Sequence, residues 1–121
     1  MKRGIVLATA AGVGLLYLST MAGAQDKKKI EQGMALFVSQ KCNQCHSIAG
    51  KGNVKGPMDG IGTRLSADEI QQWIADPDAM RAKTKATRTP EMKLIKLNKN
   101  QVDALVAYLM TMKSATPDVP K

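Results

Sequence analysis

Apolar side chains recur with helical spacing shortly after the N-terminal region. Residues three and four positions apart share one face of a helix, and this spacing is kept by Ile30, Gly33, Met34, Phe37 and Val38. Most positions between them are charged or polar. The pattern predicts an amphipathic helix from about Asp26 to about Lys41.

A second stretch with the same spacing lies near the C-terminus. Its apolar face consists of Val102, Leu105, Val106, Leu109 and Met112. Asn98 precedes it, and Gln101 follows three residues later, which is a helix N-cap signal. We expect a final helix that runs to about Lys113, followed by a flexible tail over residues 114–121, where two prolines interrupt any periodicity.

The chain between these helices contains one more helix signal and two irregular stretches. Ser66 and Glu69 form a capping-box pattern before a short apolar run that must end near Asp76, because Pro77 follows. The glycine-rich stretch 47–65 predicts looped backbone that wraps closely around something, and 77–97 predicts mostly a long loop. With no strand pattern and no repeat, the fold class is all-α, with three to four helices.

The first 24 residues have the three parts of a secretory signal peptide. Lys2 and Arg3 precede an apolar run to Leu18, and the small residues before Gln25 suit cleavage there. The predicted domains are therefore a signal peptide at 1–24, one domain at 25–113 and the tail at 114–121. The alternative is an uncleaved membrane anchor. Export places the protein in the periplasm.

Basic residues are concentrated in one segment of the chain. The 121 residues contain 18 Lys plus Arg and 10 Asp plus Glu. Seven of these cations, against Glu91 alone, lie between Arg81 and Lys99. Nucleic-acid binding is not expected, because an exported chain with Phe37, Trp73 and Tyr108 as its only aromatic residues after the signal peptide offers few stacking surfaces.

The residues with the most specific chemistry are Cys42, Cys45 and His46, in the order Cys-x-x-Cys-His. This is the attachment motif of c-type haem, in which two thiols bind the porphyrin covalently and the histidine binds the iron. The competing interpretations are a dithiol redox centre, a zinc site and a plain disulfide. A zinc site would need further Cys or His ligands that the chain lacks, because it has two Cys and one His.

The second axial position of the iron must be filled by something other than histidine, because His46 is the only one. Methionine, lysine, an outside ligand or no ligand remain open. Of the methionines, Met80 and Met92 lie in the long loop that has to cover the other haem face, and the residues alone leave both as candidates.

The chain resembles a class I cytochrome c over nearly its whole length after the signal peptide. The resemblance rests on the early Cys-x-x-Cys-His motif, on Gly56-Pro57 and on the Leu105–Leu109 segment of the last helix. It implies that this fold wraps around one covalently bound haem c. It also implies that Gly33 and Phe37 pack against Leu105 and Tyr108.

The same resemblance implies roles for three further residues. The Pro57 carbonyl would accept a hydrogen bond from the His46 ring, and Trp73 would reach a haem propionate. Met92, which lies 16 residues before Tyr108, has the family spacing of the axial ligand, although Lys93 follows it where many members have a proline. The expected site is thus Cys42 and Cys45 for attachment, His46 and Met92 on the iron, and Pro57 and Trp73 around the cofactor.

The function that follows is electron transfer, not catalysis. With protein ligands on both sides of the iron, the expected role is a one-electron carrier between redox partners outside the cytoplasm. The basic segment indicates partners with an acidic docking surface, such as an oxidase, a respiratory complex or a dehydrogenase. The alternatives are a dedicated haem subunit of one redox enzyme and an open-site haem enzyme or sensor. Membrane contact is expected only with an uncleaved signal peptide.

Overall fold

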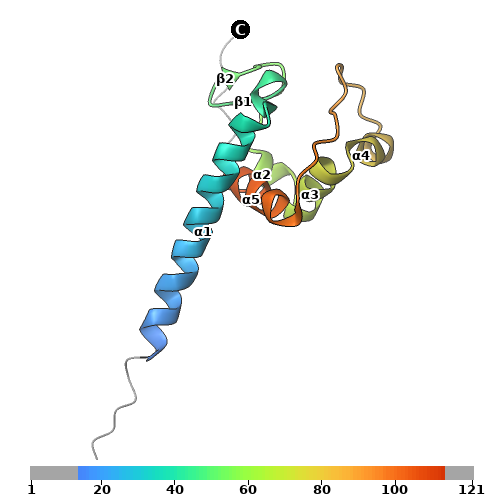
Figure 1. Cartoon of the computed structure of the whole chain (residues 1–121). Coiled ribbons are helices and arrows are strands. Elements are labelled where there is room, and N and C mark those ends of the chain that lie inside the picture. The colour runs from blue at the N-terminus through green and yellow to red at the C-terminus, as the bar shows by residue number, and fades with distance from the viewer. Residues whose placement is uncertain (1–13, 114–121) are drawn as a thin grey trace, which may run out of the picture.

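The computed structural model describes residues 14–113 and consists mainly of helices (Figure 1). The elements in chain order are α1 (Gly14–Ser39), a 3-10 helix (Cys42–Gln44), β1 (Ser47–Ile48), β2 (Lys51–Gly52), α2 (Ile61–Arg64), α3 (Ala67–Ala75), α4 (Pro77–Thr84) and α5 (Lys99–Leu109). The two strands form a small antiparallel hairpin with Ser47 opposite Gly52. The predicted all-α class is confirmed, with this hairpin as a minor addition that the sequence pattern did not indicate.

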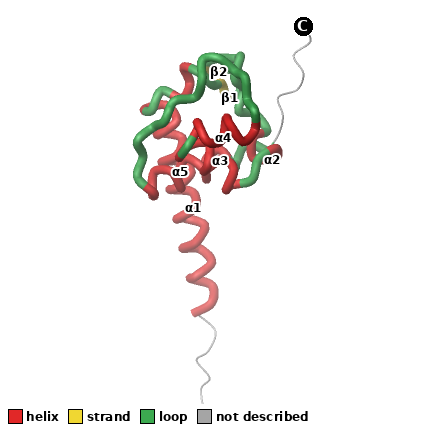
Figure 2. The backbone as a smooth tube through the Cα atoms, turned by 90° about the vertical axis from the view of Figure 1, so that its right-hand side faces the viewer, coloured by secondary structure: helices red, strands yellow, loops and turns green. Residues whose placement is uncertain are grey.

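Helix α1 starts upstream of the predicted helix and ends close to where it was expected. Its N-terminal half extends away from the other elements in both views (Figures 1 and 2). The predicted cleavage point between Ala24 and Gln25 falls within this helix. Residues 1–13 of the predicted signal peptide and the predicted tail at 114–121 lie outside the described residues. Within residues 14–113, no helix has both the length and the apolar character needed to span a membrane.

The crossing of α1 with α5 is the most extensive helix contact in the structure. At this crossing Gly33 faces the backbone of Ala104, and a methyl group on Gly33 would lie 2.6 Å from Tyr108 Cβ. Phe37 packs edge-on against Tyr108, with ring centroids 6.1 Å apart, and belongs to the same core cluster as Leu105. The predicted contact between these two helices is therefore present, and the missing side chain of Gly33 allows it.

Both predicted helix caps are present. Ser66 Oγ accepts from Glu69 N at 3.2 Å, while Glu69 Oε2 accepts from Ser66 N at 2.8 Å. Asn98 and Gln101 make the same reciprocal pair at 3.0 Å in each direction. Each cap satisfies two backbone groups that the first turn of a helix leaves unpaired, which is why α3 and α5 begin where the sequence indicated.

The prediction of a loop from 77 to 97 is wrong for its first third, which forms α4. Pro77 ends α3 but is also well suited to the first position of a new helix, where its missing N–H is not needed. The Asp76 side chain caps this helix by accepting from Ala79 N at 3.0 Å. Lys85 ends it in the left-handed conformation, with φ 54°. Asp76 thus serves as the C-cap of α3 and the N-cap of α4.

The last helix is shorter than predicted. It ends at Leu109, and Thr111 N and Met112 N then bond to the carbonyls of Tyr108 and Leu109 in tighter turns. This change of direction brings the chain against α2, where Gly62 N donates to Met112 O at 3.0 Å. The end of the described chain is thereby fixed to the segment that leads into the site.

Candidate haem site

The Cys-x-x-Cys-His motif forms one tight turn directly after α1. Lys41 adopts a left-handed conformation, with φ 59°, that ends the helix, and Cys45 N and His46 N both donate to the Cys42 carbonyl, at 3.1 and 2.9 Å. Both thiols are free and partly buried. Burial raises the pKa of the Cys42 thiol, as does the neighbouring Cys45, while a backbone hydrogen bond lowers it. The turn places both thiols and the imidazole on one short piece of backbone.

The His46 ring is held by a backbone carbonyl, but not by the one that was predicted. Its Nδ1 lies 3.1 Å from Gly56 O, so Gly56 and not Pro57 supplies this contact. Ser47 N also donates to Gly56 O, and Met58 N donates back to Ser47 O. These two hydrogen bonds form an isolated parallel bridge between Ser47 and Pro57, which directs the Gly56 carbonyl toward both Ser47 N and the His46 ring.

Three effects act on the basicity of His46. Burial lowers the pKa of the imidazole, the hydrogen bond with Gly56 raises it, and the nearby positive charge of Arg88 lowers it. The result is a pKa below the ordinary value. A neutral imidazole with its Nδ1 bonded to a carbonyl leaves the other nitrogen, Nε2, as the atom that can bind a metal.

A cavity of about 520 Å³ opens beside this turn and is lined mainly by apolar side chains. Its volume lies within the roughly 300–1,000 Å³ typical of cofactor pockets. The lining includes both cysteines, His46, Met92 and Trp73, which come from the motif, the loop before α5 and helix α3. The apolar part of the wall comes mostly from Phe37, Met58, Ile61, Leu65, Ile70, Ile74, Pro77, Ile95, Leu105 and Leu109.

The two candidate methionines are separated clearly by their positions. Met92 is partly buried and lines the cavity. Met80 is buried on α4, with 4% of its surface exposed, and does not line the cavity. Of the other methionines among residues 23–113, only Met58 is on the wall, directly after Pro57 and therefore close in the chain to the carbonyl that holds His46.

The cavity wall also contains residues that the sequence reasoning missed. Arg64, Arg81 and Arg88 all line it, and these are the only arginines in the chain after Arg3. The lysines of the basic segment are exposed. Arg64 and Arg88 are exposed as well, but no lysine of the basic segment lines the cavity. The distinction between arginine and lysine was an available signal, because the planar fork of arginine suits directed hydrogen bonds.

The comparisons with known proteins agree with this geometry. Residues 30–113, more than half of the chain, match the family model described as Cytochrome c. The chain belongs to the cytochrome c family. Its cofactor is haem c, and Cys42 and Cys45 fit the attachment motif. Members of this family typically transfer electrons and function outside the cytoplasm.

The chain is also similar to a curated protein. The chain is 26% identical over 91 residues to "Cytochrome c oxidase subunit 2" of Alkalihalophilus pseudofirmus, an alignment that covers 68% of this chain and 25% of that protein. The cytochrome c chain described here thus spans about a quarter of the length of that relative. No solved structure matches significantly.

The cavity of this cytochrome c fits a covalently attached haem. An apolar wall suits the porphyrin faces, the free thiols suit its attachment, and the arginines offer partners for its carboxylates. Among the described residues no group of three or more His, Cys, Asp or Glu could form a separate metal site, so the zinc interpretation finds no support there.

Proposed function

We propose that this cytochrome c is a one-electron carrier outside the cytoplasm, with His46 and Met92 as the axial ligands of its iron. The observation that carries the proposal is the single cavity whose walls bring together Cys42, Cys45, His46 and Met92. Bound haem supplies a reversible one-electron couple. The chain's own residues attach it, orient it and exclude water and small molecules from the metal.

Each site residue has a distinct task in this proposal. Gly56 O fixes the orientation of the His46 ring, and Met92, on the cavity wall, would bind the iron in place of an outside ligand. Trp73 is on the same wall, and its indole N–H would donate to a haem carboxylate. Protein ligands on both sides leave the iron little change of geometry between its oxidation states, which favours fast electron transfer.

The ligand assignment is tested by three matched methionine variants. Met92→Leu should abolish the red charge-transfer band of methionine-ligated ferric haem and allow the reduced protein to bind carbon monoxide. Met80→Leu and Met58→Leu should keep the band, because their volume is conserved and neither is proposed as a ligand. A wild-type protein that lacks the band and binds carbon monoxide would rule out the carrier and favour the open-site enzyme or sensor.

Four of the seven cations in the basic segment remain as candidates for a docking surface. Of the seven cations between 81 and 99, Arg81 pairs with Asp78 and Glu91, Lys99 pairs with Asp103, and Arg88 bonds to a backbone carbonyl. The remaining four are Lys83, Lys85, Lys93 and Lys96, all exposed and without an ion pair among the described residues.

We propose that these four lysines guide an acidic redox partner, such as an oxidase, to the cavity mouth. Complementary charge chiefly accelerates encounter, so the rate of electron transfer to such a partner should fall as salt is added. Lys93→Glu with Lys96→Glu should lower the second-order rate at low salt by about tenfold or more. A rate that is insensitive to both salt and substitution would contradict the docking proposal.

The match to a subunit of an oxidase favours one second candidate, a dedicated haem subunit or domain of a redox enzyme. In that case the basic surface would be a permanent interface, and a partner would remain bound through purification of the natively expressed protein.

The mass of the same purified protein tests whether the N-terminal segment is cleaved. We propose that residues 1–24 are removed in the periplasm, so the mature mass should correspond to residues 25–121 plus one haem.

A further inference from the structure

The segment that carries Met92 has very little polar support of its own. Residues 87–97 are irregular, and within the described part of the chain none of them makes a backbone-to-backbone hydrogen bond. The same segment contributes Arg88, Pro90, Glu91, Met92 and Ile95 to the cavity wall. A stretch of this kind opens more easily than a helix, unless side chains hold it.

The first contact that holds it is made by Arg88, four residues before Met92. Its Nη2 donates to the Cys45 carbonyl at 2.5 Å, over a separation of 43 residues in the chain. The guanidinium lies on Gly56, where an added methyl group would overlap both of its terminal nitrogens. Arg88 therefore joins the Met92 segment to the turn that carries Cys45 and to the residue whose carbonyl holds His46.

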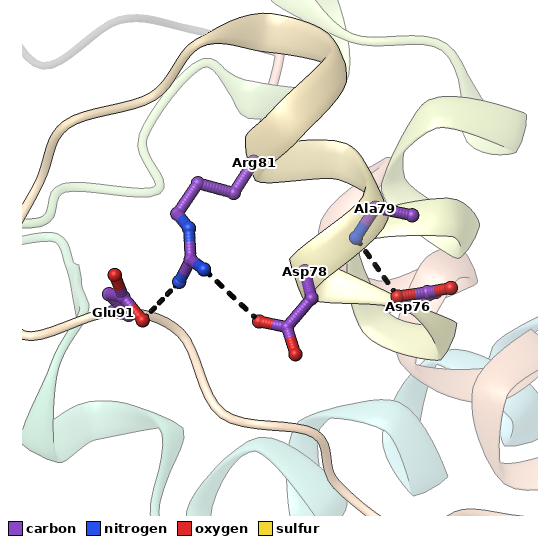
Figure 3. A network of polar contacts seen from close by, with 5 residues as sticks. All are labelled: Asp76, Asp78, Ala79, Arg81 and Glu91. Atoms are coloured by element: carbon purple, nitrogen blue, oxygen red, sulfur yellow. Dashed lines mark hydrogen bonds and ion pairs between the residues drawn. The ribbon is translucent and has the colours of Figure 1, made fainter.

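The second contact is made three residues further along the segment, at Glu91, directly before Met92. Glu91 forms an ion pair with Arg81, which projects from α4 and also approaches Asp78 Oδ1 at 3.6 Å (Figure 3). Helix α4 is itself fixed by the Asp76 cap, drawn in the same view. Arg81 thus connects the Met92 segment to a capped helix, whereas Arg88 connects it to the attachment turn.

Hence we propose that Arg88 and the Arg81–Glu91 pair are positioning contacts that keep the Met92 segment closed over the cavity. These contacts would determine the open fraction, which is the small fraction of molecules in which Met92 is displaced. This inference rests on the proposed function, in which Met92 is the axial ligand. No other polar contact of residues 87–97 is present in the described chain, so these two should carry most of the polar stabilisation of the closed segment.

The opening can be measured with imidazole as the outside ligand. Imidazole binds the ferric protein only when Met92 is displaced, so its apparent affinity equals the intrinsic affinity multiplied by the open fraction. Arg88→Gln should raise this affinity about tenfold, because it removes a charge-assisted hydrogen bond that a neutral side chain replaces poorly. Glu91→Gln should raise it about threefold, because that ion pair is largely exposed, with 60% of the Glu91 side chain accessible.

Two controls separate positioning from a general effect of charge. Lys51→Gln removes one positive charge from an exposed residue of β2 and should change the affinity less than twofold. Arg88→Lys keeps the charge but loses the planar fork, and should lie between wild type and Arg88→Gln. Proteolytic cleavage within residues 87–97 should become faster in Arg88→Gln, while cleavage in the α1–α5 crossing stays unchanged.

The outcomes distinguish this inference from the proposed function. A wild-type protein without the methionine band would defeat the proposed function before any variant is compared. A wild-type protein with the band, in which Arg88→Gln and Glu91→Gln bind imidazole no more tightly than Lys51→Gln, would overturn the inference and leave the carrier intact.

Discussion

The crossing of α1 and α5 offers a strong test of the packing argument, through Gly33→Ala. Alanine is the better helix former, by about 1 kcal/mol in a helix interior, so propensity alone predicts a more stable protein. The structure predicts the opposite, because the added methyl group would lie 2.6 Å from Tyr108 Cβ and closer still to the Ala104 carbonyl oxygen. Backbone atoms cannot move aside as the end of a flexible side chain can.

The size of the effect follows from setting helix propensity against steric overlap. Inserting a methyl group into a well-packed contact typically destabilises by about 1–3 kcal/mol, and forcing two helix backbones apart lies toward the upper end. After subtracting the gain in propensity, we expect a net loss of about 1–2 kcal/mol. For a domain of this size that lowers the melting temperature by roughly 5–15 °C.

The measurement is thermal and denaturant unfolding of the ferric holoprotein, followed by far-ultraviolet circular dichroism. Gln32→Ala serves as the matched control, because Gln32 is the exposed neighbour on the same helix and its change should stay within about 0.5 kcal/mol. A Gly33→Ala protein that is as stable as wild type, or more stable, would refute the close crossing and show that helix propensity outweighs packing at this position.

Three further changes test the core, a cap and the cofactor. Leu105→Ala should lower the free energy of unfolding by about 2–5 kcal/mol in a denaturant titration, because its side chain is only 2% exposed. Ser66→Ala should lower it by about 1 kcal/mol at neutral pH by removing the α3 cap. In the wild-type protein, hydrogen bonds with Ser66 hold the pKa of the Glu69 carboxyl below the ordinary 4.5. The stability difference between wild type and Glu69→Gln should therefore be present above that pH and shrink as pH falls below it. The Cys42→Ala, Cys45→Ala protein, which cannot attach haem, should lose cooperative unfolding in a calorimeter. Without haem, the apolar side chains that line the cavity would have no surface to pack against and would face water.

Each of these predictions can fail in a specific way. A Leu105→Ala loss below 1 kcal/mol would mean that the core can collapse around the missing atoms. A gap between wild type and Glu69→Gln that stays constant from neutral pH down to about pH 3 would remove the cap hydrogen bonds as the reason for the lowered pKa. A haem-free variant with a sharp unfolding transition would show that the chain does not need the cofactor to fold.

The sequence by itself determined the features that depend on neighbours in the chain. The Cys-x-x-Cys-His order requires both thiols and the imidazole to share one turn, whatever surrounds it. The caps at Ser66 and Asn98 act over three residues, so they placed the starts of α3 and α5 correctly. The apolar stripe that ends in Val38 and the one that begins at Val102 identified the two main helices, because helical spacing is a local property. Two members of the first stripe, Met34 and Val38, are nevertheless exposed in the structure.

Only the tertiary structure decided which distant residues meet at the cavity. Met80 and Met92 have the same side chain and lie in the same basic region, yet α4 buries one of them away from the cavity and the irregular segment brings the other to its wall. The bond to His46 comes from Gly56 because carbonyl direction depends on the bridge with Ser47, which spans ten residues. The inward direction of Arg88 likewise follows from a contact over 43 residues of chain with Cys45. Such pairings are set by the packed fold as a whole, because the backbone position that creates each one is fixed by elements far away in the sequence.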